Sequence, residues 1–517
     1  MTTDSKNRSV LPDFGDMLFL TILLFQIRLL PNFLFNDGST GWHLSIGKYV
    51  LEHGWVPYQD FISYTMAGKP WIAFYWLPDV LMAIAGKIGG YNGIATLVAS
   101  TIALLFLLLY ERCRRAGCNF VTSGFLILLG AIVSTVHWLA RPHIMTFVGT
   151  YVFASLIDDF HKDKISAKKL LLGLSLMMLA WVNSHPGFVI GFAILAIYGF
   201  VAAVRFLIIA EKQKALPELK GLFLAGLCCL ATTFINPYGL ELHKNLGEYL
   251  GQSRVVDYVD EYLSPVFHGS LQTASLELLF FLVVIGIGIT RTRMSIPQTL
   301  TVLAFGHLAL NAMRNLPLFV LVAVPYVGEL FSKTKFDKYV EETAALGGVL
   351  GALVKRWQSL NAGIDATEAQ CNMHILPALA FVFFMAVSAN GGSLLGQQML
   401  ATGFDKHRMP TKTLDCIRQH ELDPHHGFNQ VNWGGYINYQ AGIPVFIDDR
   451  ASFYGEDFYL NYGNIISMFP GWQEQLDRLK IRWVLFPKSA PFAQRLKADP
   501  SWRVLCEDDA AYLFVRN

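Results

Sequence analysis

The chain contains a long series of apolar segments, and this feature limits it to the folds that a lipid bilayer allows. A transmembrane helix needs about 20 mostly apolar residues, and eleven segments have that character. Only 15% of the 517 residues are charged, against roughly 25% in soluble domains. We therefore predict a polytopic α-helical membrane protein with about 11 transmembrane helices. The predicted spans are Met17–Phe35, Tyr91–Tyr110, Phe120–Trp138, Ile144–Leu156, Leu170–Trp181, Phe188–Phe206, Leu222–Ile235, Ser275–Thr290, Ile296–Ala312, Leu316–Phe331 and His374–Ala389.

The apolar segment Trp71–Gly90 is a special case, because it contains Pro78 and Asp79. If it lies along the membrane surface, all the clusters of Lys and Arg fall on one side of the membrane. This is the distribution that the positive-inside rule expects of cytoplasmic loops. We therefore predict an interfacial amphipathic helix here, with a cytoplasmic N-terminus and an extracytoplasmic C-terminus. The basic clusters are Arg112–Arg115, Lys162–Lys169, Lys212–Lys220, Arg291–Arg293 and Lys333–Arg356.

Two parts of the chain follow from this topology. Residues 1–395 are predicted to form the transmembrane domain, and its first apolar run is expected to be a signal anchor, because it is too long for a signal-peptide core. Its polar loops are predicted at 36–90 and 236–271 outside and at 332–372 inside. Residues 396–517 are long enough to fold as a separate extracytoplasmic domain.

The tail has the pattern of an α/β domain. Trp433–Tyr439 and Ile443–Ile447 are short apolar runs separated by a turn, Trp472–Leu479 has helical spacing, and Trp483–Phe486 and Ala511–Val515 resemble strands. The tail also holds Cys416 and Cys506. These two cysteines can form a disulfide on the oxidising side of a membrane, but their spacing alone leaves the pairing open.

Asp37 follows the first predicted span directly, within the sequence Asn36-Asp37-Gly38-Ser39. A carboxylate at the outer membrane surface is placed to meet a lipid headgroup and a water-borne partner together. The alternative is that Asp37 caps the helix beginning near Gly41, since Asp is a common capping residue.

Arg141 and Arg314 lie in short outer turns, against the positive-inside bias. An arginine at the outer surface can bind phosphate through its planar fork of donors. The alternative is that each side chain extends to lipid headgroups. A third arginine, Arg28, lies within the first span, where an ionised group usually faces a cavity or a partner.

Several motifs occur at the outer turns in a characteristic order. In this order they resemble a bacterial branch of the GT-C-type membrane glycosyltransferases, and the resemblance covers most of the chain. It implies a GT-C-like fold in a bacterial inner membrane. The motifs are Asp37…Gly41-Trp42-His43, Arg141-Pro142-His143, Asn183-Ser184-His185-Pro186-Gly187, Asn236-Pro237-Tyr238-Gly239, Arg314-Asn315-Leu316-Pro317, Trp433-Gly434-Gly435-Tyr436 and Asp448-Asp449-Arg450.

The resemblance also implies a reaction. Enzymes of this type move a sugar from a polyprenyl-phosphate carrier to an acceptor, and Asp37 matches their acidic residue as a general base. Arg141 and Arg314 would stabilise the departing lipid phosphate. Where many such enzymes have two adjacent acids, Asn36-Asp37 supplies one. Sugar or phosphate binding is implied for His43, His143 and His185, with Asp60 and Asp79 as second-choice acids.

In the tail, Trp433 and Tyr436 resemble part of the peptide-recognising element of oligosaccharyltransferases, and aromatic rings of this kind stack well on sugars and peptides. The alternative is a glycine-rich turn before a strand. Asp448-Asp449-Arg450 is similarly interpreted as a salt-bridged strand end.

Competing functions remain open at this stage. The chain could be a non-catalytic assembly subunit that presents its tail as a binding module, or a transporter, although we find no internal repeat of the kind common in transporters. The net charge of +2 gives no indication of nucleic-acid binding. No metal cofactor is expected, because no set of His, Asp and Glu shows metal-ligand spacing.

Overall fold

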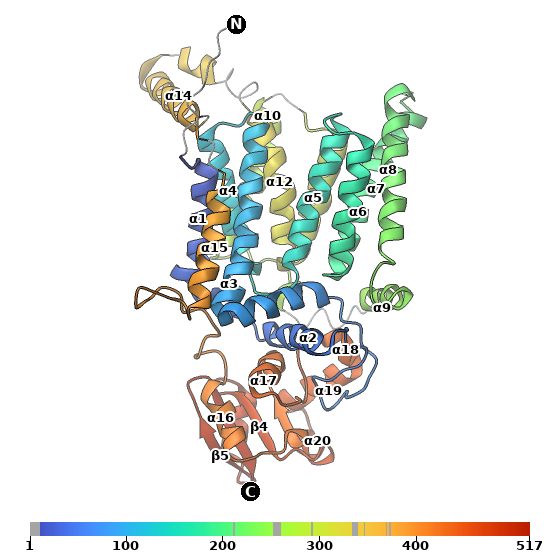
Figure 1. Ribbon diagram of the computed structural model, residues 1–517, viewed down its shortest axis with the longest axis vertical. Coiled ribbons are helices and arrows are strands. Elements are labelled where there is room, and N and C mark those ends of the chain that lie inside the picture. The colour runs from blue at the N-terminus through green and yellow to red at the C-terminus, as the bar shows by residue number, and fades with distance from the viewer. Residues whose placement is uncertain are drawn as a thin grey trace.

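The computed structural model describes residues 11–209, 212–251, 260–290, 293–332, 340–345, 347–368, 370–371 and 374–517. Arg291 and residues 333–339 of two predicted basic clusters lie outside this part of the chain. The described chain is mostly helical, with a helical bundle at one end and a smaller part containing a β-sheet at the other (Figure 1).

The bundle follows the predicted apolar segments, since each of them overlaps a helix. Six described helices are long and apolar enough to cross a membrane, namely α3, α4, α7, α8, α10 and α12. The chain is therefore a membrane protein, while the count of about 11 crossings stays a prediction. The bundle helices are α1 (Phe14–Leu24), α3 (Trp76–Arg115), α4 (Phe120–Ser134), α5 (Ile144–His161), α6 (Ala167–Val182), α7 (Val189–Leu207), α8 (Lys212–Thr232), α10 (Leu271–Thr290), α11 (Ile296–Asn311), α12 (Leu316–Leu330) and α15 (Leu376–Ala389).

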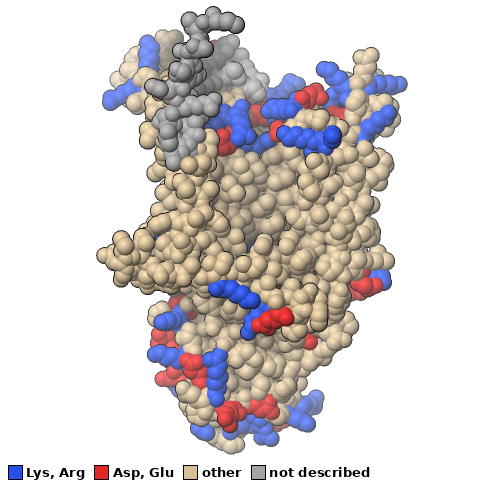
Figure 2. Space-filling model, in the orientation of Figure 1, with Lys and Arg blue, Asp and Glu red and all other residues tan. Residues whose placement is uncertain are grey.

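Charged residues are sorted along the long axis of the molecule. On the face drawn in Figure 2, a broad band over the bundle has no Lys, Arg, Asp or Glu, and charges gather beyond both ends of it. Large apolar side chains such as Leu176 and Phe223 are exposed on bundle helices. Exposed apolar side chains over an uncharged band are what contact with lipid hydrocarbon requires.

The first predicted span is shorter than expected. Its helix α1 passes into a π-helical turn at Phe25–Leu29, and Pro31 follows, which removes a backbone donor and disfavours a helical conformation at the preceding residue. Arg28 lies on this π-helical turn with its side chain exposed. Arg28 is also absent from the residues that line the cavity described below.

Helix α3 consists of two arms. Gly89 and Gly90 have non-helical backbone angles, and the φ of +57° at Gly90 is one that glycine adopts readily. The first arm lies across the lower end of the bundle, and the second runs along the bundle axis (Figure 1). A sharp turn of this kind is what a surface helix followed by a membrane span needs, and the helical part of the predicted 71–90 segment begins at Trp76.

The C-terminal part contains a four-stranded sheet in the order β3-β4-β6-β5, comprising β3 (Gly427–Asn429), β4 (Trp483–Pro487), β5 (Trp502–Glu507) and β6 (Ala511–Arg516). Strand β3 is parallel to β4, and the other two pairs are antiparallel. The helices beside the sheet are α16 (Thr411–Gln419), α18 (Ala451–Tyr454), α19 (Glu456–Ile466), α20 (Trp472–Arg478) and α21 (Pro491–Lys497).

The run 433–439 is helical, which overturns the expected turn and strand. Helix α17 (Gly434–Ala441) packs across α2 (Ser39–His53), the helix that follows Asp37. A Cβ atom on Gly41 would lie 2.3 Å from the carbonyl oxygen of Gly435. The helices can cross this closely only because both positions lack a side chain. Tertiary packing thus decides the conformation here, and the glycines serve the crossing.

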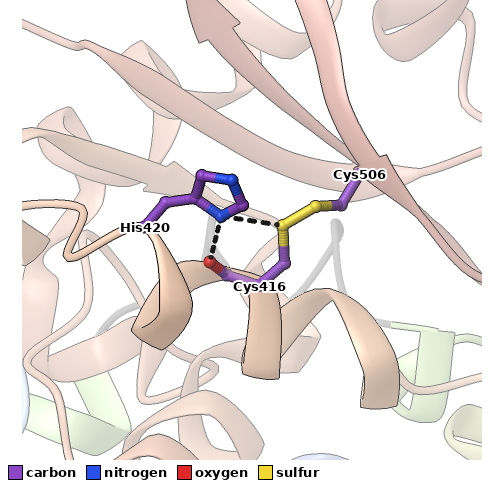
Figure 3. A group of neighbouring side chains, drawn as sticks. All are labelled: Cys416, His420 and Cys506. Carbon is purple, nitrogen blue, oxygen red and sulfur yellow. Dashed lines mark hydrogen bonds between the residues drawn. A yellow bond between two sulfur atoms is a disulfide. The ribbon is translucent and has the colours of Figure 1, made fainter.

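The first loop and the tail are joined by further contacts. Ser63 forms a parallel β-bridge with Val445, and Arg450 pairs with Asp60 at 2.8 Å. The disulfide that the sequence left open is present between Cys416 on α16 and Cys506 on β5, with the ring of His420 beside it (Figure 3). The sheet is thereby tied to α16, and the tail to the first loop.

Two other helices and a short β-hairpin lie in the segments that connect the bundle helices with one another or with the tail. Helix α9 (Leu240–Gly251) lies in the second outer loop, where residues 252–259 are outside the described chain. Helix α14 (Gly348–Glu368) occupies most of the described part of the predicted inner loop. The short hairpin of β1 (Ser393–Leu394) and β2 (Gln397–Gln398) connects α15 to the tail.

Candidate functional site

A cavity of about 970 Å³ lies where the bundle, the first loop and the tail meet. Its walls come from chain segments hundreds of residues apart, because the α2–α17 crossing brings the tail under the turns of the bundle. Most of the predicted site residues line this cavity. They are Asp37, His43, Arg141, His143, His185, Arg314 and Trp433.

Asp37 uses its two carboxylate oxygens differently. Oδ1 accepts a hydrogen bond from the backbone N–H of Ser39, at the first residue of α2, at 2.9 Å. Oδ2 accepts one from Nη1 of Arg141 at 2.7 Å. Asp37 therefore supports the start of a helix that begins two residues before the predicted position near Gly41, and it also forms an ion pair in the cavity.

Glu261 joins the two exceptional arginines. Its Oε2 lies 3.2 Å from Nη1 of Arg141, and its Oε1 lies 3.0 Å from Nη1 of Arg314. Burial alone would raise the pKa of Glu261, but the charges of the two arginines lower it to about 2. Arg314 also lies over the ring of Tyr262, 4.4 Å from its centroid. Both arginines therefore face the cavity, and the alternative that they extend to lipid headgroups is not supported.

The three predicted histidines are held by specific partners. Nδ1 of His43 lies 2.8 Å from Oδ1 of Asp79, and both side chains are buried. Nδ1 of His185 accepts a hydrogen bond from the N–H of Gly187, so the proton of a neutral ring is on Nε2. Nε2 of His143 lies 2.8 Å from a backbone carbonyl oxygen.

Burial and the nearby arginine charges lower the pKa of all three rings. For His43 and His143 the pKa falls well below 6.5, and for His185 it falls to about 3. Neutral imidazoles can donate to and accept from sugar hydroxyls, but they add no positive charge to the cavity.

Asp449, which the sequence interpretation assigned to a salt-bridged strand end, is a functional candidate in the structure. Its Oδ1 accepts a hydrogen bond from the indole N–H of Trp42 at 2.8 Å, and it lines the same cavity. Burial, and then the negative charge of Asp37, raise the pKa of Asp449 to about 8, although Arg141 opposes the shift. The cavity therefore contains Asp449, a carboxyl group with a raised pKa, and Glu261, one with a lowered pKa.

The neighbouring residues of the Asp448–Arg450 motif have the predicted structural role, although they lie in a loop and not at a strand end. Arg450 pairs with Asp448 through Nη2 at 2.7 Å and with Asp60. Asp60 also accepts hydrogen bonds from Ser63 and does not line the cavity. Its contacts hold the first loop against the tail.

The predicted aromatic pair of the tail is separated by the structure. The indole N–H of Trp433 donates to the carbonyl oxygen of Arg408 at 2.9 Å, at the cavity wall. Tyr436 is buried against Phe404, with the ring centroids 4.8 Å apart, and does not reach the cavity.

Groups of three side chains of the types that can bind metals lie close together at two places in the described chain, although two members of the first group are joined in the disulfide. One contains Cys416, His420 and Cys506, and the other contains Asp13, Asp16 and His374. Neither group lines the cavity. The described cavity residues thus offer ion pairs and hydrogen bonds.

Comparison with solved structures identifies the fold. The archaeal oligosaccharyltransferase AglB from Archaeoglobus fulgidus, in complex with an inhibitory peptide and a dolichol-phosphate, superposes with a TM-score of 0.57 at 14% identity, covering 92% of this chain and 69% of that one. The apo form of the Archaeoglobus fulgidus enzyme gives a TM-score of 0.56 at 14% identity and the same coverage. ArnT from Cupriavidus metallidurans, bound to undecaprenyl phosphate, gives 0.48 at 11% identity over 96% of this chain and 97% of that one, too low to support an argument.

No protein-family model matches the chain, and no curated protein matches it. The similarity to the archaeal oligosaccharyltransferase shows that this chain shares the fold of that enzyme. The resemblance noted from the sequence motifs is therefore confirmed for the fold.

Proposed function

We propose that this protein is a membrane glycosyltransferase that moves a sugar from a polyprenyl-phosphate-linked donor to an extracytoplasmic glycan, lipid or protein. The observation that carries the proposal is the array of Asp37, Arg141 and Arg314 at one cavity. An acid beside guanidinium groups suits a reaction in which a hydroxyl loses a proton and a phosphate gains negative charge.

In the proposed reaction, the acceptor oxygen attacks the anomeric carbon and its proton passes to the carboxylate of Asp37. The bond between that carbon and the phosphate oxygen breaks, and the electron pair stays with the phosphate. Arg141 and Arg314 stabilise the resulting charge through hydrogen bonds that act in a partly buried site. In the free enzyme Asp37 forms an ion pair with Arg141, so the acceptor hydroxyl competes with Arg141 for Oδ2 of Asp37. No divalent metal is required by this scheme.

Three observations support the choice of a lipid-linked donor. The cavity is lined by the turns that precede bundle helices and by the tail, which is where a headgroup at the end of a hydrocarbon chain would lie. One structure with the same fold was solved with a dolichol-phosphate. The basic clusters at the opposite end of the bundle agree with a cytoplasmic N-terminus, and this orientation puts the cavity and the tail outside the inner membrane.

The proposal is tested by comparing the extracytoplasmic glycans and lipids of a host that expresses the wild type or Asp37→Asn. The matched control is Asp415→Asn, an exposed carboxylate on α16. Loss of a defined sugar with Asp37→Asn alone would support the transferase. Unchanged profiles at equal expression, compared with a host lacking the protein, would remove Asp37 from catalysis and favour the non-catalytic assembly subunit.

A further inference from the structure

The guanidinium groups of Arg141 and Arg314 converge on one small anion. Arg141 comes from the turn before α5, and Arg314 comes from the short helix before α12. Each approaches a different oxygen of the same Glu261 carboxylate, at 3.2 and 3.0 Å. Because a carboxylate is about as wide as one edge of a phosphate group, the two arginines are spaced to hold a single phosphate between them.

The charges at this position also fit a phosphate. Two arginines bring two positive charges to a site where side chains are about four-fifths buried. Asp37 and Glu261 are carboxylates that form ion pairs with them in the free protein. Binding of a phosphate would therefore add negative charge beside these carboxylates, which is unfavourable unless one carboxylate moves away from the arginines.

Asp37 and Glu261 differ in how firmly other groups hold them. Asp37 is anchored by the backbone of Ser39 through its second oxygen. Both oxygens of Glu261 are used by the two arginines themselves. Glu261 is therefore the carboxylate that a phosphate would replace, because two phosphate oxygens could accept the same hydrogen bonds from the two arginines.

We propose that Arg141 and Arg314 form the binding site for one phosphate group, and that Glu261 occupies this site in the free protein as an internal competitor. A phosphate ester enters by replacing the Glu261 carboxylate between the two guanidinium groups. Glu261 thus sets the affinity for phosphate and keeps both arginines paired when no ligand is bound. The inference rests on the proposed function only for the claim that the phosphate belongs to a lipid-linked sugar donor.

The test measures phosphate binding to the purified full-length protein in detergent, without any transfer reaction. The ligands are inorganic phosphate and farnesyl phosphate, with farnesol as the uncharged control. Binding is followed by calorimetry and by the shift of thermal unfolding. The variant is Glu261→Gln, which keeps the size of the side chain and removes its charge. The matched control is Glu248→Gln, which removes a negative charge from the same cavity wall.

Glu261→Gln is expected to bind farnesyl phosphate about 10-fold more tightly than the wild type, because one charge-assisted pair no longer competes. Glu248→Gln is expected to bind like the wild type. Tighter binding of both phosphates supports a site for the phosphate group itself, and tighter binding of farnesyl phosphate alone supports a lipid phosphate site. Equal or weaker binding of both by Glu261→Gln would overturn the inference.

A second measurement covers the case in which Glu261→Gln unfolds. Glu261→Asp keeps the charge on a shorter side chain and is expected to bind phosphate between the wild type and Glu261→Gln. Affinity no higher than that of the wild type in every folded variant would also overturn the competitor role. These outcomes are separate from the proposed function, since Asp37→Asn tests sugar transfer and the Glu261 variants test phosphate affinity.

Discussion

The carboxylate of Asp37 accepts a hydrogen bond from the guanidinium of Arg141 at 2.7 Å, although 104 residues separate them in the chain. Asp37 precedes α2, and Arg141 precedes α5. The pair therefore joins the first loop to a turn of the bundle, and changes to either residue affect both the cavity and the packing around it.

Replacing Arg141 with Met should destabilise the protein, because Asp37 and Glu261 would be left as partly buried carboxylates without this partner. Removal of one partner of a buried ion pair costs about 3–5 kcal/mol. The temperature of unfolding in detergent should therefore fall clearly. Arg503→Met, on an exposed position of β5, is the control and should change stability by less than about 0.5 kcal/mol. Similar unfolding temperatures for both variants would contradict the prediction.

Stability should depend on pH through Asp449. Burial and the charge of Asp37 raise its pKa to about 8 in the folded protein, against about 3.9 in an unfolded chain. The folded state then binds more protons, so this contribution to stability is complete below about pH 4 and is lost as the pH rises to about 8. Asp449→Asn should flatten the curve of unfolding temperature against pH over this range. A wild-type curve identical to that of the variant would exclude the raised pKa.

The pKa of Asp449 should in turn depend on Asp37. Asp37→Asn removes a negative charge that disfavours ionisation of Asp449, while Arg141 stays nearby. The pKa of Asp449 should therefore fall in this variant. The infrared band of the protonated carboxyl group, followed during a pH titration, reports the shift. Assignment of the band requires its loss in Asp449→Asn, and an unchanged titration in Asp37→Asn would show that the two groups do not interact.

Gly41→Ala should weaken the attachment of the tail. The new methyl group would lie 2.3 Å from the carbonyl oxygen of Gly435, so α2 and α17 would have to separate. Overpacking of this kind costs about 1–3 kcal/mol. Gly463→Ala is the control, because its methyl group would meet no atom within 4 Å on α19, and it should stabilise by about 0.5–1 kcal/mol. Limited proteolysis and thermal unfolding measure both, and equal behaviour would argue against the crossing.

Cys416 and Cys506 should be bonded in protein from an oxidising compartment. The bridge joins residues 90 positions apart, and a disulfide closing a loop of this size contributes about 2–4 kcal/mol. Mass spectrometry of a digest should show the linked peptides without reductant and two alkylated cysteines after reduction. Cys416→Ser should lower the unfolding temperature by an amount that reductant reproduces in the wild type. Two free thiols in unreduced protein would rule out the bond.

The sequence alone was sufficient to predict a membrane protein and to identify most of the cavity residues that come from the outer turns of the bundle. Apolar segments report helices directly, because a bilayer leaves the backbone few other ways to satisfy its hydrogen bonds. Arg141 and Arg314 stood out because cations outside a membrane oppose a general bias. These signals are local, so they can be recognised without knowing what the residues contact.

Tertiary structure alone decided the rest. Glu261 and Asp449 are ordinary acidic residues in the sequence, and they become special only through the arginines and the indole that they contact. Asp60 shows the opposite outcome. It is a candidate acid in the sequence of the first loop, but in the structure it forms an ion pair with Arg450. The run 433–439 became a helix because its glycines pack on α2. Each of these outcomes depends on a partner from a distant segment of the chain, and the packing of the whole chain determines which partner that is.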